Sequence, residues 1–371
     1  MKKILYYILT IIALTSCNDI PPIIDSENFK ADSIRFSLST YEIFANDMYN
    51  EKIYFICRSD KKHLLCYDIN DNIIDTIVTD NRIVDISVVN DSCIFYTDYP
   101  SLFNYNVKNA KDKSYDYFEN IYETVSHPFW KDDYKCVPVY PDNKLTMIDE
   151  NSGIVLCLKY YTYGDDYSVV LENNVPVWMR FDIAADSSIM PVSFFGTYPK
   201  NHPSDNYHDG GALRMCFNHK SKEIITHTSV DDYVVLCDSM GNKIRDVYFG
   251  SQLYKYSPYP KENKNIMAES IKHFYSTTLY GKILFDEYRN LYYRLMTVPI
   301  ENDSESMTKQ NFVDFVIIVA DENLNIKYEV FFKGEKYHLL PALINEKGLL
   351  LYEKENKKWE GSHTAAWFVF E

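Results

Sequence analysis

The sequence predicts an all-β fold, a β-propeller of four-stranded antiparallel blades. Short runs of aromatic and β-branched residues recur along the chain, as at 53–56, 64–67 and 73–78, and turns rich in Asn, Asp and Ser separate them. Helical periodicity is nearly absent. Hydrophobic residues make up 46% of the 371 residues and charged residues 25%, which excludes a disordered or fibrous chain.

A turn motif, in which a strand ends at an Asp or Asn within a polar turn, marks the expected repeat. It occurs six times, at spacings between 33 and 83 residues: Asp68, Asn106, Asp149, Asp182, Asp238 and Asp321. Blades of four strands need about 40–50 residues each. Together with a terminal strand at 366–370, the six markers predict seven blades, with six blades as the alternative.

The N-terminal strand is expected to close the ring, because an open ring would leave exposed sheet edges. Residues 33–38 lie alone before the first full repeat unit. We expect them to add the outer strand to the blade built from residues 348–352 and the C-terminal strand. Residues 31–371 would then form a single propeller domain, in which each blade packs on its neighbours.

The first 17 residues have the parts of a bacterial lipoprotein signal. Lys2 and Lys3 precede an apolar stretch at 4–14, and Leu-Thr-Ser-Cys at 14–17 resembles a lipobox. As a helix, the apolar stretch would be only about 16 Å long, roughly half of the hydrocarbon core of a membrane. We therefore expect a lipoprotein signal peptide at 1–16, then the lipidated (palmitate-bearing) Cys17 and a flexible tether at 17–30. An ordinary secretory signal followed by a chance cysteine is the alternative.

The charge of the chain bears on its partners and its location. The net charge of −15 excludes a basic nucleic-acid-binding protein, because neutralisation of phosphates needs clustered Lys and Arg. No later stretch reaches the roughly 18 apolar residues of a membrane span, so the acyl group would be the only anchor. We expect a monomer in the cell envelope, anchored at the outer membrane and facing the periplasm or the surface. Its partners would be the membrane, through the lipid, and an envelope protein or glycan.

Seven cysteines follow Cys17, and most lie within strand-like runs. Their number is odd and no Cys-x-x-Cys occurs, so we expect them to be small buried hydrophobic side chains. A disulfide framework, which an extracytoplasmic location permits, or a zinc site is the alternative.

One run of residues resembles a known family. The lipobox, the irregular all-β repeat and the stretch at 280–294, with Asp-x-x-Arg-Asn-x-Tyr-Tyr-Arg at 286–294, resemble an uncharacterised family of Bacteroides-type lipoproteins. The resemblance covers most of the chain and implies a TolB-like β-propeller outside the cytosol. It implies no catalytic residues, because the family has none established.

The common catalytic and metal-binding motifs are missing from the sequence. There is no His-Glu-x-x-His, no Gly-x-Ser-x-Gly and no phosphate-binding glycine-rich loop. The segment that starts at Asp68 resembles a calcium loop, but Ile73 stands where Gly is needed and Thr79 where Glu is needed. The sequence therefore predicts no metal, no cofactor and no catalytic residues.

The polar segment at 201–211 is the first candidate ligand site. His202, His208 and Asp209 could contact a ligand, and two glycines at 210 and 211 would let the backbone approach it closely. The alternative is an ordinary connection between blades that binds nothing.

The second candidate site combines Tyr292 with Arg294. Alternation along a strand places these two side chains on one face and Tyr293 on the other. A planar guanidinium beside a flat ring suits contact with a carboxylate or a sugar. The alternative is a tyrosine packed between two blades. Trp359 lies in a polar hairpin and could stack on a sugar or anchor a partner.

These observations predict a lipid-anchored propeller that binds a protein or glycan partner and performs no chemistry of its own. The reason is that loops at one end of the blades of a propeller converge on a central funnel, where ligands collect. A propeller glycoside hydrolase or lyase acting on polysaccharide is one alternative, and it would need paired carboxylates in the funnel. A purely structural envelope protein is the other.

Overall fold

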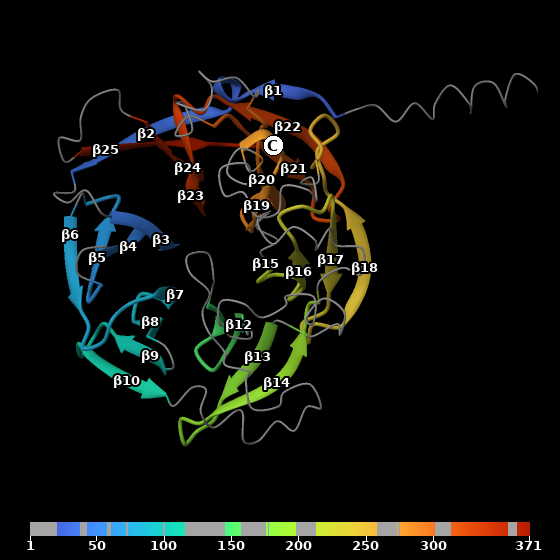
Figure 1. Ribbon diagram of the computed structural model, residues 1–371. Helices are drawn as coiled ribbons and strands as arrows, with labels where there is room; N and C mark the ends of the chain where they lie inside the picture. The colour runs from blue at the N-terminus through green and yellow to red at the C-terminus, as the bar shows by residue number, and fades with distance from the viewer. Residues whose placement is uncertain are drawn as a thin grey trace, which may run out of the picture.

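Within the residues that the computed structural model describes, 25 β-strands form six sheets around a common axis (Figure 1). These residues are 21–37, 43–57, 61–71, 73–98, 101–115, 145–156, 176, 178–197, 213–257, 273, 275–300, 313–354 and 362–371. The predicted all-β propeller of four-stranded antiparallel blades is therefore confirmed. In that part of the chain, no helix is long and apolar enough to cross a membrane.

The first three blades follow one another along the chain, each from its inner to its outer strand. Blade 1 contains β3 (Ile43–Tyr49), β4 (Lys52–Cys57), β5 (His63–Asp68) and β6 (Ile73–Val78). Blade 2 contains β7 (Asp85–Asn90), β8 (Cys93–Asp98), β9 (Ser101–Asn106) and β10 (Lys111–Tyr115). Blade 3 contains β11 (Thr146–Asp149), β12 (Ser152–Leu156), β13 (Trp178–Ile183) and β14 (Ile189–Phe195).

The remaining three blades complete the ring, and two of them use N-terminal strands. Blade 4 contains β15 (Arg214–Phe217), β16 (Ile224–His227), β17 (Tyr233–Cys237) and β18 (Lys243–Tyr248). Blade 5 contains β19 (Tyr280–Asp286), β20 (Leu291–Thr297), β21 (Phe315–Ala320), β22 (Ile326–Phe332) and, as a fifth strand, β1 (Ile23–Asp25). Blade 6 contains β23 (Tyr337–Asn345), β24 (Gly348–Glu353), β25 (Ser362–Phe368) and β2 (Lys30–Ser37).

The hydrophobic core of the described residues is divided into six clusters, each between two neighbouring blades. In β4, Ile53 and Phe55 pack toward blade 6, whereas Tyr54 and Ile56 pack toward blade 2. Successive side chains of a strand point to opposite faces, so a strand between two blades is apolar throughout. This explains the continuous apolar runs of the sequence, such as β21, in which every residue is buried.

The predicted number of seven blades is wrong, because two of the six turn markers belong to one blade. Asp149 ends β11 and Asp182 lies near the end of β13, and both strands are in blade 3. In Asp68, Asn106, Asp238 and Asp321, a side-chain oxygen accepts backbone N–H groups further along the turn. Asp149 does the same after an inner strand. The same turn chemistry serves both hairpins of a blade, so it cannot count blades.

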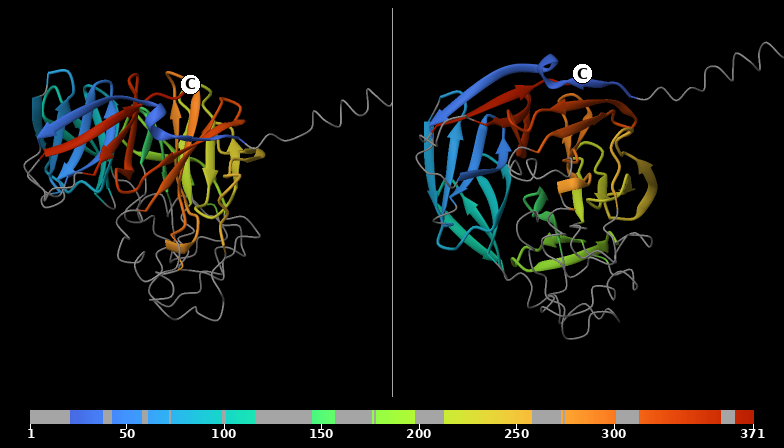
Figure 2. Two further views of the ribbon diagram at one scale, coloured as in Figure 1. Left: turned by 90° about the horizontal axis from the view of Figure 1, so that it is seen from above. Right: turned by 45° about the horizontal axis from the view of Figure 1, so that its top comes forward.

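The N-terminal segment closes the ring, as predicted. Its strand β2 pairs with β25 in antiparallel fashion, with Ser33 opposite Ala366. The structure differs at residues 23–25, which lie in the expected tether but pair with β22 in parallel as β1. A 3₁₀ turn, η1 (Ser26–Asn28), joins the two strands. We call residues 21–37 the N-terminal strap; Figure 2 shows it in blue along the outside of blades 5 and 6.

The cysteines that the structure describes form no disulfides, which agrees with the expectation from their odd number. They are Cys57, Cys66, Cys93, Cys216 and Cys237. The last three are buried, and burial raises the pKa of Cys216 to about 12 and that of Cys93 and Cys237 to about 11. Cys136 and Cys157 lie outside the described residues.

Candidate functional site

A cavity of about 270 Å³ lies on the axis of the ring, where the inner strands of five blades meet. Its lining includes eleven apolar residues, among them Met48, Trp178 and Phe285. The polar side chains that line it are Asp47, Thr146, Arg214, His219 and Lys282. The polar groups come from β3, β11, β15 and β19 and from the turn after β15, so only the closed ring brings them together.

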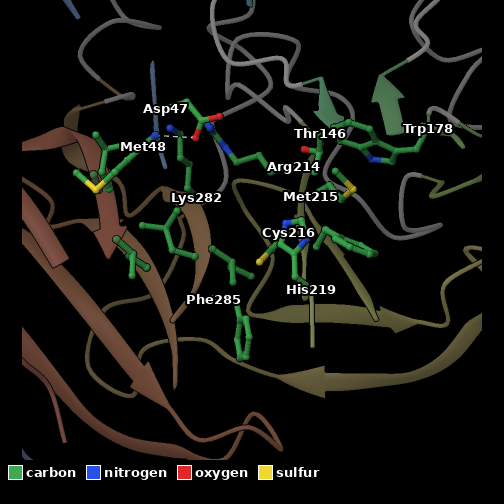
Figure 3. Close-up of a pocket in the computed structure, with 16 residues that line it drawn as sticks. Asp47, Met48, Thr146, Trp178, Arg214, Met215, Cys216, His219, Lys282 and Phe285 are labelled. Atoms are coloured by element: carbon green, nitrogen blue, oxygen red, sulfur yellow. Dashed lines mark hydrogen bonds between the residues drawn. The ribbon is translucent and has the colours of Figure 1, made fainter. Parts of the chain in front are cut away.

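The charged side chains gather at one end of this cavity. Asp47, Lys282 and Arg214 point toward one another there, whereas His219 and Phe285 lie at the other end (Figure 3). Two cations therefore face one carboxylate, in a protein whose net charge is −15.

Irregularities in the inner strands place two of the three charges. The register of β3 on β4 shifts between Ala45 and Asp47, and that of β19 on β20 shifts between Tyr280 and Ile283, the interval that contains Lys282. Shifts of this kind interrupt the ordinary alternation of a strand and re-aim side chains. We attribute the convergence of Asp47 and Lys282 to these two shifts.

Backbone hydrogen bonds fix the carboxylate of Asp47. One oxygen accepts from the N–H of Met48 at 2.9 Å, and the other accepts from the N–H of Val88 in blade 2 at 2.7 Å. In the same way, Asp85 of blade 2 accepts from the N–H of Leu145, at the start of blade 3, at 2.9 Å. These inner-strand carboxylates tie consecutive blades together, so the position of Asp47 is set by the ring.

The opposite end of the cavity carries a histidine. His219 is an exposed residue in the turn after β15, and its ring meets the ring of Phe217 edge-on at 4.9 Å between centroids. Desolvation lowers the pKa of His219 below its usual 6.5, and Lys222 lowers it further. At neutral pH this imidazole is uncharged, so it can both donate and accept a hydrogen bond.

The predicted pair Tyr292 and Arg294 lies elsewhere, between blades 4 and 5. Tyr292 packs toward blade 4 and Tyr293 toward blade 6, as the strand alternation predicts. The hydroxyl of Tyr292 is 2.6 Å from the side-chain amide of Asn218, which donates to it. Neither Tyr292 nor Arg294 lines the axial cavity.

Arg294 is fully buried and binds the backbone of blade 4. Its guanidinium donates to the carbonyls of Asp231 at 2.7 Å and Phe249 at 2.9 Å, and it lies 3.7 Å from the centre of the Tyr280 ring. Burial lowers the pKa of Arg294 to about 10, while Tyr280 and Asp232 counteract this, so the group stays charged at neutral pH. The planar donor fork therefore joins two blades.

The distinctive run at 286–294 thus connects blade 5 to both neighbours. On the side of blade 6, buried Asp286 accepts from Arg289 at 2.9 Å and from the hydroxyl of Tyr293 at 2.6 Å. Arg289 also donates to the carbonyl of Glu346 in blade 6 at 2.6 Å. On the side of blade 4, Asn290 accepts from Lys220 at 2.7 Å. These side chains therefore hold blade 5 to blades 4 and 6.

The other predicted site residues, Cys17, His202, His208, Asp209 and Trp359, lie outside the described residues. Their predicted roles therefore stay predictions. Trp178 is buried and lines the cavity. Among the described residues, no cluster of three or more His, Cys, Asp or Glu could hold a metal ion.

Sequence reasoning missed the axial cluster. Asp47, Arg214 and Lys282 are far apart in the chain, and each lies in a mostly apolar strand. A charged residue in the mostly apolar innermost strand of a blade is a usable signal of a polar site on the axis, since a charge that is removed from water needs a partner. The innermost strands can be identified only when the boundaries of the blades are known correctly.

Buried His227 gives a prediction for the pH dependence of stability. Its ring is held 3.0 Å from the carbonyl of Thr228, and its pKa lies well below 6.5 because of burial and of the nearby Arg294. The unfolded chain therefore binds a proton, near pH 6.5, that the folded chain excludes. We expect the free energy of unfolding to fall as the pH drops below about 6.5, by up to about 1.4 kcal/mol per pH unit.

The measurement compares the wild type with His227→Gln in urea unfolding between about pH 5 and pH 7.5, a range that brackets the ordinary histidine pKa. The variant should show the smaller loss of stability toward acid. Burial raises the pKa of Glu329, which gives a slope of opposite sign, but that contribution is common to both proteins. Equal slopes in the two proteins would contradict the prediction.

Comparisons with known proteins place the chain near a family of unknown function. Residues 194–329 match the model of the domain of unknown function DUF4221. A crystal structure of a DUF4221 member from Bacteroides vulgatus has a TM-score of 0.65 at 15% identity, covering 92% of this chain and 97% of that one. The expected kinship to an uncharacterised family found in Bacteroides is thus supported over this part of the chain.

Two further solved structures are similar at lower TM-scores. A calcium-binding protein from Agrobacterium tumefaciens, regucalcin, has a TM-score of 0.46 at 7% identity, with 94% of this chain and 96% of that chain covered. A gluconolactonase from Xanthomonas campestris has a TM-score of 0.45 at 6% identity, with 95% and 96% covered. No curated protein matches the chain.

Proposed function

We propose that this protein is a lipid-anchored propeller of the cell envelope that binds a protein or glycan partner without transforming it. The axial cavity is the observation that carries the proposal. It is lined by residues of five blades and combines apolar walls with a charged end. Concave sites of this composition, in which a few polar groups fix the orientation of a ligand, are typical of ligand binding.

The charges of the cavity favour binding over glycoside hydrolysis. Glycosidases of the common type need two carboxyl groups about 5–10 Å apart. Asp47 is the single carboxylate among the described residues that line the cavity, and its two oxygens already accept backbone hydrogen bonds that tie blade 1 to blade 2. An acid fixed in this way is suited to holding the ring and to balancing the two cations.

The proposed anchor rests on the residues at 2–17. The positive start, the apolar stretch and the Leu-Thr-Ser-Cys ending favour lipidation of Cys17. The N-terminal strap begins only four residues after this cysteine, so the anchor would attach at the outer edge of blade 5. A fatty-acid label fed to expressing cells should enter the wild type and be absent from Cys17→Ala. Label in both proteins, or in neither, would contradict the anchor.

A binding screen tests the central proposal. The chain from residue 18 onward is presented to envelope proteins and to a panel of glycans, and any ligand that binds is then incubated with the protein and analysed for cleavage. We expect one partner to bind and to be recovered intact. Cleavage of a glycan would favour the hydrolase instead, and no binding by any probe would favour a purely structural role.

A further inference from the structure

We propose that the outer rim of blade 5 is the surface that contacts the membrane, so that the axis of the ring lies parallel to the lipid surface. This inference deepens the proposed anchoring and rests on it, because it starts from a lipid on Cys17. Three observations carry it: the short connection from Cys17 to β1, the position of β1 at the rim, and the side chains that surround β1.

The connection between the anchor and the ring is short. From Cys17 to Ile23, the first residue of β1, there are six peptide units, which reach at most about 22 Å when fully extended. The strand β1 is held in place, because it pairs with β22 over three residues and the N–H of Glu329 donates to the carbonyl of Pro22 at 2.9 Å. A lipid on Cys17 would therefore enter the membrane within about 22 Å of this strand.

The position of β1 directs this reach to one side of the ring. It is the outermost of the five strands of blade 5, and the inner strand β19 is four strands away (Figure 1). At about 4.8 Å between neighbouring strands, blade 5 alone is about 19 Å wide from its rim to its inner strand. The rims on the far side of the axis are farther still, so they lie out of reach of a lipid on Cys17.

Exposed apolar side chains adjoin β1 at this rim. Ile23 is 37% exposed and Leu253 is 55% exposed. Both lie beside the fully buried Glu329, because Ile23 pairs with Glu329 and the N–H of Gln252, next to Leu253, donates to its carboxylate at 2.8 Å. Apolar side chains held at an exposed edge in this way can enter the boundary between headgroups and acyl chains.

Two exposed lysines flank these apolar side chains. Alternation along β22 places Lys327 and Phe331 on the face of Glu329, and the ammonium of Lys333 lies 5.4 Å from the centre of the Phe331 ring. Asp25 shares this face, and its carboxylate accepts a backbone N–H of η1 at 2.9 Å. In a protein whose net charge is −15, this rim combines apolar tips with lysines, a composition that suits anionic headgroups.

The proposed orientation has a consequence for the axial cavity. With the rim of blade 5 on the membrane, neither end of the ring is covered by lipid. A partner in the aqueous phase can then approach the axis from either end. A ring that lay on one of its ends would instead have that end closed by the membrane.

Fluorescence quenching by brominated lipids tests the orientation. A chain that begins at Cys17 is coupled through its N-terminal cysteine to a lipid in vesicles made of equal parts of phosphatidylcholine and phosphatidylglycerol, whose acyl chains carry bromine. Leu253→Trp places a reporter on the rim of blade 5. Val107→Trp is the matched reporter, because Val107 is exposed in the turn after β9 of blade 2, on the opposite side of the ring (Figure 1).

The wild type, with its native tryptophans, gives the baseline of this measurement. Above that baseline, we expect bromine to quench the added fluorescence of Leu253→Trp at least about twofold more than that of Val107→Trp, because apolar contacts at a membrane surface are buried about 5–10 Å into it. Equal quenching of the two reporters, or stronger quenching of Val107→Trp, would overturn the proposal.

Charge reversals in the Leu253→Trp protein test the contribution of the lysines. Lys327→Glu and Lys333→Glu should each lower the ratio of contacting to non-contacting protein by about fivefold, which is measured as a loss of quenching; this corresponds to about 1 kcal/mol for a basic residue near an anionic surface. Lys111→Glu is the matched control, because Lys111 is exposed on β10, the outer strand of blade 2, and it should leave the quenching unchanged. Quenching that survives both reversals, or that falls equally in the control, would contradict a contact through this rim.

The outcomes also separate this proposal from the anchoring on which it rests, because the coupling to the vesicle is chemical. If fatty acid enters Cys17 in cells but the two reporters of the coupled protein are quenched equally, the anchor stands and the orientation fails. If the coupled protein contacts the vesicle through the rim but no fatty acid enters Cys17 in cells, the anchor fails, and the orientation fails with it for the protein in the cell.

Discussion

A chain that begins at residue 38 is expected to be unable to form the closed ring, whereas a chain that begins at residue 21 should fold like the full-length protein. The difference between the two is the N-terminal strap, which supplies an outer strand to each of two neighbouring blades. Without it, the backbone groups of β22 and β25 would become unpaired sheet edges, which promote aggregation.

The contacts of the strap explain the expected size of the effect. Along β2, seven residues pair with β25, and Phe29 adds ring contacts to Tyr328 and Phe370 at 5.4 and 5.2 Å between centroids. The N–H of Val369 donates to the carbonyl of Phe29 at 3.0 Å. At about 0.5–1.5 kcal/mol for each hydrogen bond, together with the burial of aromatic surface, the loss approaches the roughly 5–15 kcal/mol that stabilise a typical protein.

Gel filtration and the fluorescence of the protein provide the measurement, because Trp367 lies opposite Asp32 of the strap and is buried. The shorter chain should elute as aggregates and lack a cooperative melting transition. A synthetic peptide of residues 21–37, added during refolding, should restore both, while a peptide of the same composition in scrambled order should not. A shorter chain that melts at the temperature of the longer one would show that the strap is dispensable.

The fold could be predicted from local patterns because each strand carries its own signal. A strand between two blades is apolar on both faces, and the turns carry Asp or Asn at the position where the side chain caps the backbone. The number of blades could not be predicted in the same way. Asp149 and Asp182 show the same turn signal on the two hairpins of one blade, so counting turns overestimated the blades by one.

The candidate site was harder to predict, for a reason that the run at 286–294 illustrates. A guanidinium beside a tyrosine ring has the same chemistry whether it binds a ligand or the carbonyls of a neighbouring blade. Burial decides between the two, and burial depends on residues of blade 4 that are distant in the chain. The axial charges have no shared motif at all, because Asp47, Arg214 and Lys282 meet only after the ring has closed.

The substitution Arg294→Met is expected to destabilise the protein by about 3–5 kcal/mol. The two short hydrogen bonds to the carbonyls of Asp231 and Phe249 each involve a charged donor, and such bonds contribute about 1.5–3 kcal/mol. Met fills much of the same volume but donates no hydrogen bond, so these carbonyls would stay buried without that partner. The contact with the ring of Tyr280 would be lost as well.

Two further variants separate charge from geometry. Arg294→Lys keeps the positive charge but lacks the planar fork, so its stability should fall between that of the wild type and that of Arg294→Met. Arg245→Met is the matched control, because Arg245 is exposed on β18 and donates one bond, to the carbonyl of Asn323 at 3.2 Å. Its unfolding free energy in urea should stay within about 0.5 kcal/mol of the wild type.

The same series tests whether Arg294 binds a ligand, as its sequence context suggests. If Arg294 stabilises the ring, its replacement should lower the unfolding free energy, and any loss of binding should follow the loss of folded protein. If Arg294 binds a ligand, its replacement should lower the affinity and leave the unfolding free energy near that of the Arg245→Met control. Because Arg294 is fully buried against four backbone carbonyls of blade 4, we expect the first pattern. The second pattern would indicate that the ligand site lies at the interface of blades 4 and 5. That interface would then have to open when a ligand binds.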